Sequence, residues 1–224
     1  MIWLTNLHHY KVKIGLAYCT DVQKKRVKEV EWEEIVERKL VIVGDGGCGK
    51  TSLLSVFTLG RFPQVPTVFD TTVTDIKIDG KPVQLALWDT AGQEEYERLR
   101  PLSYSKAHVI LIGFSINSPD SLENVASKWI EEVNRLCPGI PVILVGLKTD
   151  LRNSETEIED MRNKGLSFVD PKQGETMAQQ IGAKRYIECS ALTGENVDQV
   201  FEVASRNALL VGGPGNNNGC CVIL

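Results

Sequence analysis

Residues 44–51 read GDGGCGKT; they follow the apolar run KLVIV (39–43) and open the helix-period stretch TSLLSVFTLG (51–60). They fit the pattern G-x-x-x-x-G-K-[ST], in which glycines let the backbone turn its N–H groups inward around phosphate oxygens at a helix N-terminus. Lys50 would then reach the β- and γ-phosphates of a nucleotide, and the Thr51 hydroxyl would bind Mg²⁺. The alternative is a glycine-rich turn without a ligand, which the placement between strand and helix disfavours. The loop residues expected to contact the nucleotide are Asp45, Gly46, Gly47, Cys48, Gly49, Lys50, Thr51 and Ser52.

The composition indicates one globular domain that does not bind nucleic acid. The chain has 224 residues, of which 42% are hydrophobic, enough for one domain with a sizeable core. A net charge of −4 argues against a broad basic face for nucleic acid. Apolar runs such as VILIGF (109–114) and VILVGL (142–147) have the length of strands and are too short to span a bilayer.

The cysteines and histidines show no spacing typical of a metal site. The six cysteines stand at positions 19, 48, 137, 189, 220 and 221, and the three histidines at 8, 9 and 108. The N-terminal stretch MIWLTNLHHYKVKIGL is interrupted by histidines and lysines, so it does not resemble a signal peptide. We therefore expect free thiols in a reducing compartment.

From about Lys39 onward, apolar runs of strand length alternate with helix-period stretches. Runs that are apolar on both faces and alternate with helices indicate an α/β fold, with a mostly parallel sheet covered on both sides. TTVTDIKI (71–78) instead alternates, and Asp79-Gly80 joins it to the next run, which predicts a hairpin and one antiparallel edge strand. Helix starts are expected at SPDS (118–121) and at Asp170-Pro171. The expected strands are 40–44, 71–78, 83–89, 109–114, 142–147 and 186–190, and the expected helices are 51–60, 121–136, 174–182 and 197–210.

Two segments lie outside this pattern. Residues 1–38 carry mixed charge and could form one amphipathic helix, but a solvated appendage or a misassigned gene start is the favoured interpretation. The sequence GGPGNNNG (212–219) has a composition typical of disorder. We therefore expect a domain over 39–211, an extension over 1–38 and a flexible tail over 212–224.

The segment WDTAGQEEY (88–96) lies at the end of an apolar strand and reduces the number of enzyme classes that the phosphate loop allows. Asp89 stands at the position of a carboxylate that holds Mg²⁺ through its water shell. Gly92 can bring its N–H against a γ-phosphate because no side chain intervenes. Gln93 is then placed to orient an attacking water. A phosphate loop alone would also suit a nucleotide kinase or an ATPase, whereas DTAGQ indicates a GTPase.

Two further motifs indicate guanine as the base. LKTD (147–150) follows a strand, and the Asp150 carboxylate can accept hydrogen bonds from both the guanine N1–H and its exocyclic amine. The stem of Lys148 can pack over the base. SAL (190–192) ends another strand, where the Ala191 N–H can donate to guanine O6, and Phe62 offers an apolar edge contact. Ligands bind at such strand ends, and the residues expected there are Phe62, Lys148, Asp150, Ser190, Ala191 and Leu192.

Residues from about 39 to 211 resemble a small GTPase of the Rho family, in a fungal form. The resemblance rests on KLVIVGDGGCGKTSLL, LALWDTAGQEEYERLRPLSYSKA, SPDSLENV, CPGIPVILVGLKTDLR and CSALTGENVDQVFE. The stretch SETEIEDMRNKG (154–165) matches the helical insert that separates Rho proteins from their Ras relatives. The resemblance implies a Ras-like three-layer P-loop NTPase fold with a six-stranded sheet, Mg²⁺, and a GTP/GDP switch.

The family also implies partners and cellular roles. These are a guanine-nucleotide exchange factor, a GTPase-activating protein, a Rho GDP-dissociation inhibitor, and effector kinases or formin-like proteins. The implied processes are cytoskeletal organisation, cell polarity and, in fungi, wall synthesis. Gln93 would be the catalytic residue, and the activating protein would supply an arginine next to Gly46, which must therefore stay small.

The sequence departs from the family at the first switch segment. FPQVPTVFDTTV (62–73) lacks two residues of the usual pattern, including a tyrosine that covers the phosphates. Splice errors in the gene model are an alternative explanation for this gap and for the N-terminal extension. Thr67 remains aligned with the threonine that binds Mg²⁺ and senses the γ-phosphate, so the expected metal-site residues are Thr51, Thr67 and, through water, Asp89. Leu147 replaces the Asn or Thr usual in the guanine motif, where we expect it chiefly to brace the phosphate loop.

The C-terminus predicts lipid attachment. Cys221-Val222-Ile223-Leu224 fits the C-a-a-X box, and a terminal leucine favours geranylgeranylation of Cys221. Stable anchoring takes a second signal; the tail has no basic cluster, so Cys220 is the candidate for palmitoylation. The expected location is the cytoplasmic face of the plasma membrane, with a cytosolic pool.

Three functions remain in competition on the sequence. A hydrolysing switch leads, and a nucleotide-loaded membrane scaffold with little turnover follows because the first switch segment is short. A nucleotide kinase is third, since LKTD and SAL disfavour it.

Overall fold

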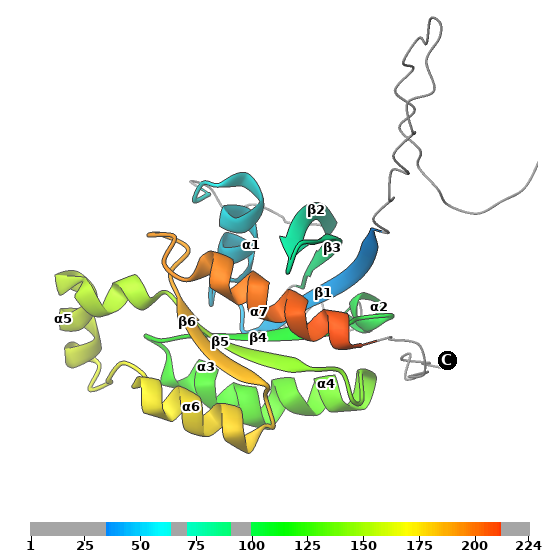
Figure 1. Ribbon diagram of the computed structural model, residues 1–224. Coiled ribbons are helices and arrows are strands. Elements are labelled where there is room, and N and C mark those ends of the chain that lie inside the picture. The colour runs from blue at the N-terminus through cyan, green and yellow to red at the C-terminus, as the bar shows by residue number, and fades with distance from the viewer. Residues whose placement is uncertain (1–34, 64–70, 91–99, 212–224) are drawn as a thin grey trace, which may run out of the picture. The chain divides into compact units, whose positions relative to one another are not determined.

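A computed structural model describes residues 35–63, 71–90 and 100–211. Its centre is a six-stranded sheet in the order β2-β3-β1-β4-β5-β6 (Figure 1). The strand β2 runs antiparallel to β3, and every other neighbouring pair is parallel, which confirms the predicted mixed sheet. The strands are β1 (Val36–Gly44), β2 (Thr71–Ile78), β3 (Lys81–Asp89), β4 (Val109–Ser115), β5 (Val142–Leu147) and β6 (Arg185–Cys189).

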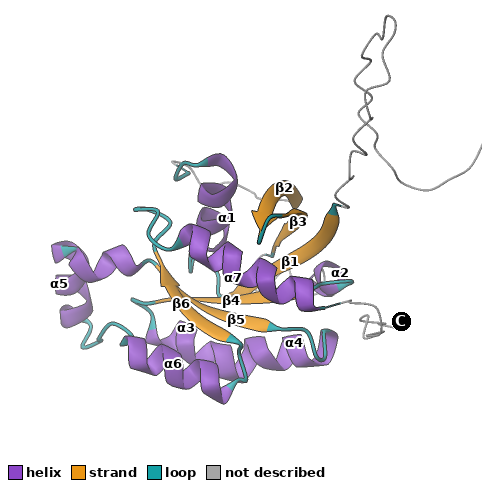
Figure 2. Ribbon diagram, in the orientation of Figure 1, coloured by secondary structure: helices purple, strands orange, loops and turns teal. Residues whose placement is uncertain are grey.

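Helices cover both faces of the sheet, as Figure 2 shows. On one face, residues of α1 (Lys50–Leu59) and α7 (Val197–Leu210) share a core with the inward side chains of β1, β3, β4 and β5. On the other face, α3 (Pro119–Asn124), η2 (Val125–Trp129), α4 (Ile130–Leu136) and α6 (Pro171–Gln180) form a second core. The three-layer arrangement expected for an α/β protein is therefore present.

The hairpin between β2 and β3 follows directly from its turn residues. Ile78 pairs with Lys81, so Asp79 and Gly80 form a two-residue loop. Both have positive φ, 52° and 82°, as a type I′ turn requires. Asn, Asp and Gly tolerate this conformation best, which is why the dipeptide predicted the turn correctly.

The strand β1 begins before Lys39, the expected start of the domain. Val36 pairs with Val83 and Arg38 with Leu85, so the mixed-charge residues extend the parallel ladder with β3. Sequence patterning missed them because they lack the apolar character of a buried strand: Val36 and Arg38 are half-buried, and Glu37 between them is exposed.

The expected helix over 121–136 is divided by a π-helical turn. The turn η2 lies between α3 and α4, and Trp129 at its end is completely buried. A π-turn widens the helix by one residue per turn and is common at functional sites. Both predicted helix starts are confirmed: the Ser118 side chain caps α3, and Asp170 forms a capping box with Gln173 at α6.

Three shorter elements complete the described chain. The helix α5 (Glu155–Asn163) occupies the expected insert, and η3 (Thr149–Asn153) precedes it. The five-residue helix α2 (Arg100–Tyr104) was not predicted, because it is too short to show a helical period. Within 35–63, 71–90 and 100–211, we find no helix with the length and apolar character that a membrane crossing needs.

Candidate nucleotide-binding site

Apart from Phe62, the predicted site residues that the structure describes lie along one edge of the sheet. The loop 44–51 leaves the carboxyl end of β1, and Asp89 ends β3. Lys148 to Asp150 follow β5, and Ser190 to Leu192 follow β6. Because parallel strands present their carboxyl ends at the same edge, motifs far apart in the sequence meet there.

The phosphate loop is shaped around the Lys50 side chain. Its Nζ donates hydrogen bonds to the Gly44 carbonyl at 2.8 Å and the Asp45 carbonyl at 2.7 Å. Only 5% of Lys50 is exposed. The ammonium is therefore held across the loop at the start of α1, where the helix N-terminus also favours an anion. Gly49 has a φ of 113°, a conformation that glycine adopts without strain.

The predicted metal ligands Thr51 and Asp89 are in contact. The Thr51 hydroxyl donates to Asp89 Oδ2 at 2.6 Å. Asp89 Oδ1 is buried and has no hydrogen-bond partner among the described residues. Burial raises the pKa of the Asp89 carboxyl, and the hydrogen bond from Thr51 and the charge of Lys50 only partly offset it.

These residues fit a hard divalent cation. An orphaned carboxylate oxygen beside a hydroxyl supplies the oxygen ligands that Mg²⁺ prefers, directly or through water. A buried polar atom without a partner is costly, so a cation or its water shell would relieve that cost. The site therefore suits Mg²⁺ next to the phosphate loop.

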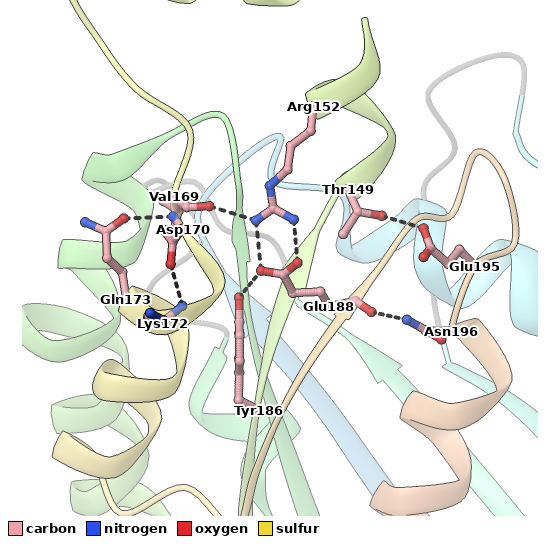
Figure 3. A network of polar contacts seen from close by, with 10 residues as sticks. All are labelled: Thr149, Arg152, Val169, Asp170, Lys172, Gln173, Tyr186, Glu188, Glu195 and Asn196. Atoms are coloured by element: carbon pink, nitrogen blue, oxygen red, sulfur yellow. Dashed lines mark hydrogen bonds and ion pairs between the residues drawn. The ribbon is translucent and has the colours of Figure 1, made fainter.

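The guanine motifs are joined by a direct hydrogen bond. Ser190 is completely buried, and its hydroxyl donates to Asp150 Oδ1 at 2.5 Å while accepting from the Thr193 N–H at 3.1 Å. This fixes the Asp150 carboxylate against the loop after β6. Thr149 also donates to Glu195 at 3.2 Å, which makes a second contact between the segment after β5 and the loop after β6 (Figure 3).

Lys148 and Leu147 link the guanine end to the phosphate loop. Lys148 has a left-handed backbone (φ 66°), and a Cβ built on Gly49 would lie 3.6 Å from Lys148 Cε. Leu147 is 1% exposed and shares a core cluster with Cys48 of the loop. The packing agrees with the expectation that Leu147 braces the loop by apolar contact.

Comparison with known proteins identifies the family. The profile of the Ras family matches residues 39–210. "GTP-binding protein rho2" of Schizosaccharomyces pombe is 63% identical over 193 residues, covering 84% of this chain and 96% of that protein. "GTP-binding protein RHO2" of Saccharomyces cerevisiae is 58% identical over 195 residues, covering 86% and 99%. "GTP-binding protein RHO1" of the same yeast is 57% identical over 186 residues, covering 82% and 88%.

The chain is a Rho-family small GTPase. The resemblance to a fungal Rho protein that the motifs indicated is thereby confirmed.

Several predicted residues of this Rho-family GTPase lie outside the described residues, and their roles stay predictions. They are Thr67, Gly92, Gln93, Cys220 and Cys221. Phe62 is described and is 42% exposed on the segment after α1, so its contact with the base also stays a prediction. The cysteines Cys48, Cys137 and Cys189 are buried and form no disulfide in the described part.

Sequence reasoning missed the anchor of the phosphate loop. Asp45 Oδ1 accepts a hydrogen bond from Trp129 Nε1 at 2.7 Å, and Asp45 Oδ2 accepts one from Asn124 Nδ2 at 2.8 Å. Both donors come from the helix α3 and its π-turn η2. The two hydrogen bonds tie both oxygens of the Asp45 carboxylate to side chains of these helices. No local signal in the sequence marks Trp129 or Asn124 for this role.

Proposed function

We propose that this protein binds GTP and GDP along the carboxyl edge of its sheet, with the phosphates on loop 44–51 and guanine between Asp150 and Ala191. Rho-family members hydrolyse GTP and act as switches between two nucleotide states, and this chain belongs to that family. The observation that supports the assignment is the meeting of Lys50, Thr51 and Asp89 with the Asp150–Ser190 pair at one edge.

Each described residue has a definite role in this proposal. Lys50 and the loop N–H groups hold the β- and γ-phosphates in place. Mg²⁺, held by Thr51 and by Asp89 through water, would neutralise charge between the β- and γ-phosphates. Asp150 accepts from guanine N1–H and the exocyclic amine, and the Ala191 N–H donates to O6.

Hydrolysis needs a water in line with the γ-phosphorus. Gln93 would orient that water, whose oxygen bonds to phosphorus as the bond to the β–γ bridging oxygen breaks, leaving GDP and phosphate. An activating protein would add an arginine beside Gly46, which is exposed and open to it. The gain from such an arginine is about 10⁵-fold in related systems.

The two nucleotide states imply partners of opposite effect. An exchange factor would release GDP, a GDP-dissociation inhibitor would sequester the lipid-bearing form, and effector kinases or formin-like proteins would bind the GTP state. Control of the cytoskeleton, polarity and the cell wall follows from such effectors.

The substitution Gln93→Leu tests the hydrolytic assignment. Because only the water-orienting amide is lost, GTP affinity should stay unchanged while stimulated single-turnover hydrolysis falls by about 10²-fold or more. Turnover is measured on GTP-loaded protein with and without a Rho-activating protein. The matched control is Gln84→Leu on β3, away from the phosphate loop, which should keep full turnover. If the parent itself shows no stimulated turnover, a nucleotide-loaded scaffold becomes the better description.

We also propose membrane attachment through two lipids on the tail. Cys221 fits the geranylgeranyl acceptor, and one prenyl chain gives only marginal, reversible binding. The only basic residue after Ala204 is Arg206, so no polybasic segment adds attraction, and palmitate on Cys220 would supply the second signal.

Fractionation of two variants at low and high ionic strength tests this attachment. Cys221→Ser should abolish membrane binding, while Cys220→Ser should leave a pool that exchanges readily with cytosol, with little dependence on salt. Firm binding of Cys220→Ser would rule out the second lipid, and membrane-bound Cys221→Ser would rule out prenylation.

A further inference from the structure

A partly buried ion pair connects the two segments that carry the guanine motifs. Arg152 Nη1 donates to Glu188 Oε2 at 2.5 Å and Arg152 Nη2 donates to Glu188 Oε1 at 2.9 Å (Figure 3). Only 27% of the Arg152 side chain and 16% of the Glu188 side chain are exposed. A two-point contact of this kind fixes orientation as well as distance.

The pair belongs to the same two segments as the base-reading groups. Arg152 belongs to η3, the same turn as Asp150, and Glu188 belongs to β6, the strand that leads into Ser190. The parallel ladder between β5 and β6 ends at Leu147 and Cys189. Beyond that point the backbone ladder no longer sets the gap between the two segments, and side chains must do so.

Two neighbouring residues, Tyr186 and Val169, also form hydrogen bonds with the pair. Tyr186 donates its hydroxyl to Glu188 Oε1 at 2.6 Å, and Arg152 Nη2 also donates to the Val169 carbonyl at 2.7 Å. Val169 directly precedes Asp170, the cap of α6. The ion pair is therefore tied to η3, β6 and the start of α6 at once.

Glycines on two other elements make room for Tyr186. A Cβ on Gly174 of α6 would lie 2.1 Å from Tyr186 Cζ, and a Cβ on Gly146 of β5 would lie 2.8 Å from the Tyr186 hydroxyl. A glycine inside a helix costs about 1 kcal/mol relative to alanine. Glycine at position 174 lowers the stability of the helix, but it leaves space for the Tyr186 ring, whose hydroxyl donates to Glu188.

Both members of the pair stay charged near neutral pH. Burial opposes ionisation of Glu188, but hydrogen bonds from Arg152 and Tyr186 outweigh it and lower its pKa. The hydrogen bonds to Glu188 raise the pKa of Arg152. A charged, two-point contact is therefore available while nucleotide is bound.

We propose that Arg152 and Glu188 are positioning residues for guanine recognition. Their ion pair sets the spacing between the Asp150 carboxylate and the Ala191 N–H, and thereby the rate of nucleotide release. The inference rests on the proposed placement of guanine between those two groups. A base that must meet an acceptor on one segment and a donor on the other is bound well only at one spacing.

Nucleotide release from full-length protein loaded with fluorescent GDP or fluorescent IDP tests the proposal. The base of IDP is hypoxanthine, which lacks the exocyclic amine of guanine. The preference for GDP over IDP, taken as the ratio of the two release rates, therefore reports how well Asp150 is oriented toward that amine. Glu188→Gln should release GDP about tenfold faster and lower the GDP-over-IDP preference about threefold, since glutamine has one acceptor oxygen and no charge, and the two-point ion pair with Arg152 becomes a weaker one-point hydrogen bond. Arg152→Lys keeps the charge with fewer donors and should fall between the parent and Glu188→Gln.

A control on a remote ion pair separates positioning from general stability. Arg206→Gln removes the exposed contacts of Arg206 with Glu202 on α7 and with Asp79 in the β2–β3 turn. It should leave both the release rate and the GDP-over-IDP preference unchanged. Thermal unfolding of every variant is measured in parallel.

Each outcome has a separate meaning. Faster release with an unchanged GDP-over-IDP preference would overturn the proposal, because the pair would then act only through general stability. Unchanged release in Glu188→Gln would overturn it as well. A parent protein with no preference for GDP over IDP would instead overturn the assignment of guanine to Asp150.

Discussion

Replacing Trp129 with phenylalanine should loosen the phosphate loop from the helix that anchors it. The indole Nε1 donates to Asp45 Oδ1 at 2.7 Å, and the side chain is completely buried. Losing a hydrogen bond to a charged group costs about 1.5–3 kcal/mol, and Asp45 is half-buried. Phenylalanine also leaves a space of roughly two to three carbon atoms, at about 0.8 kcal/mol each. The free energy of unfolding should therefore fall by roughly 3–5 kcal/mol.

The loss should also appear in nucleotide release. Asp45 follows Gly44 in the loop, and both carbonyls accept from Lys50, so a displaced Asp45 backbone moves the ammonium that holds the phosphates. If about 1.4 kcal/mol of this loss appears as weaker binding of GDP by the loop, GDP should dissociate about tenfold faster. Release of fluorescent GDP into excess unlabelled GDP measures this rate.

A second tryptophan provides the matched control. Trp88 on β3 is half-buried, and Lys39 Nζ lies 3.6 Å from the centre of its ring. Trp88→Phe makes the same chemical change and should cost only about 1 kcal/mol, chiefly by weakening this cation–π contact. If Trp129→Phe and Trp88→Phe release GDP at the same rate, the anchoring role of Trp129 is refuted.

Two further predictions concern buried contacts of the second core. Gly174→Ala should destabilise the protein by about 1–3 kcal/mol despite the better helix propensity of alanine, because the new Cβ meets the Tyr186 ring. Urea unfolding measures this loss of stability. The double variant Gly174→Ala/Tyr186→Ala should lose less stability than the sum of the losses of the two single variants. Glu132 accepts two hydrogen bonds from Arg100 and one from Tyr104; burial opposes its ionisation, but these bonds outweigh it and lower its pKa below 4.5. Its contribution is thus fully present above pH 4.5 and is lost as the pH falls through the lowered pKa. Glu132→Gln should therefore lower the free energy of unfolding by about 3–5 kcal/mol at pH 7, and by progressively less as the pH falls below 4.5. An equal loss at pH 7 and in acid would contradict this.

The elements that the sequence predicted correctly are those whose signals are local. The loop 44–51 needs only its glycines, Lys50 and Thr51 between a strand and a helix, and these are adjacent in the chain. The Asp79-Gly80 turn and the Asp170-Pro171 helix start depend likewise on the conformations that neighbouring residues prefer. The carboxyl-edge location followed because parallel strands with helical crossovers permit few arrangements.

Only the tertiary structure decided which distant side chains support the site. Trp129 is 84 positions from Asp45, and Arg152 is 36 positions from Glu188. Their contacts depend on the π-turn that directs Trp129 inward and on the register in which β5 and β6 pair. Neither feature leaves a periodic signal, because both are settled by packing between elements rather than by the preferences of adjacent residues. The sequence therefore indicated which residues the candidate site contains, whereas packing between elements determined which distant side chains contact them.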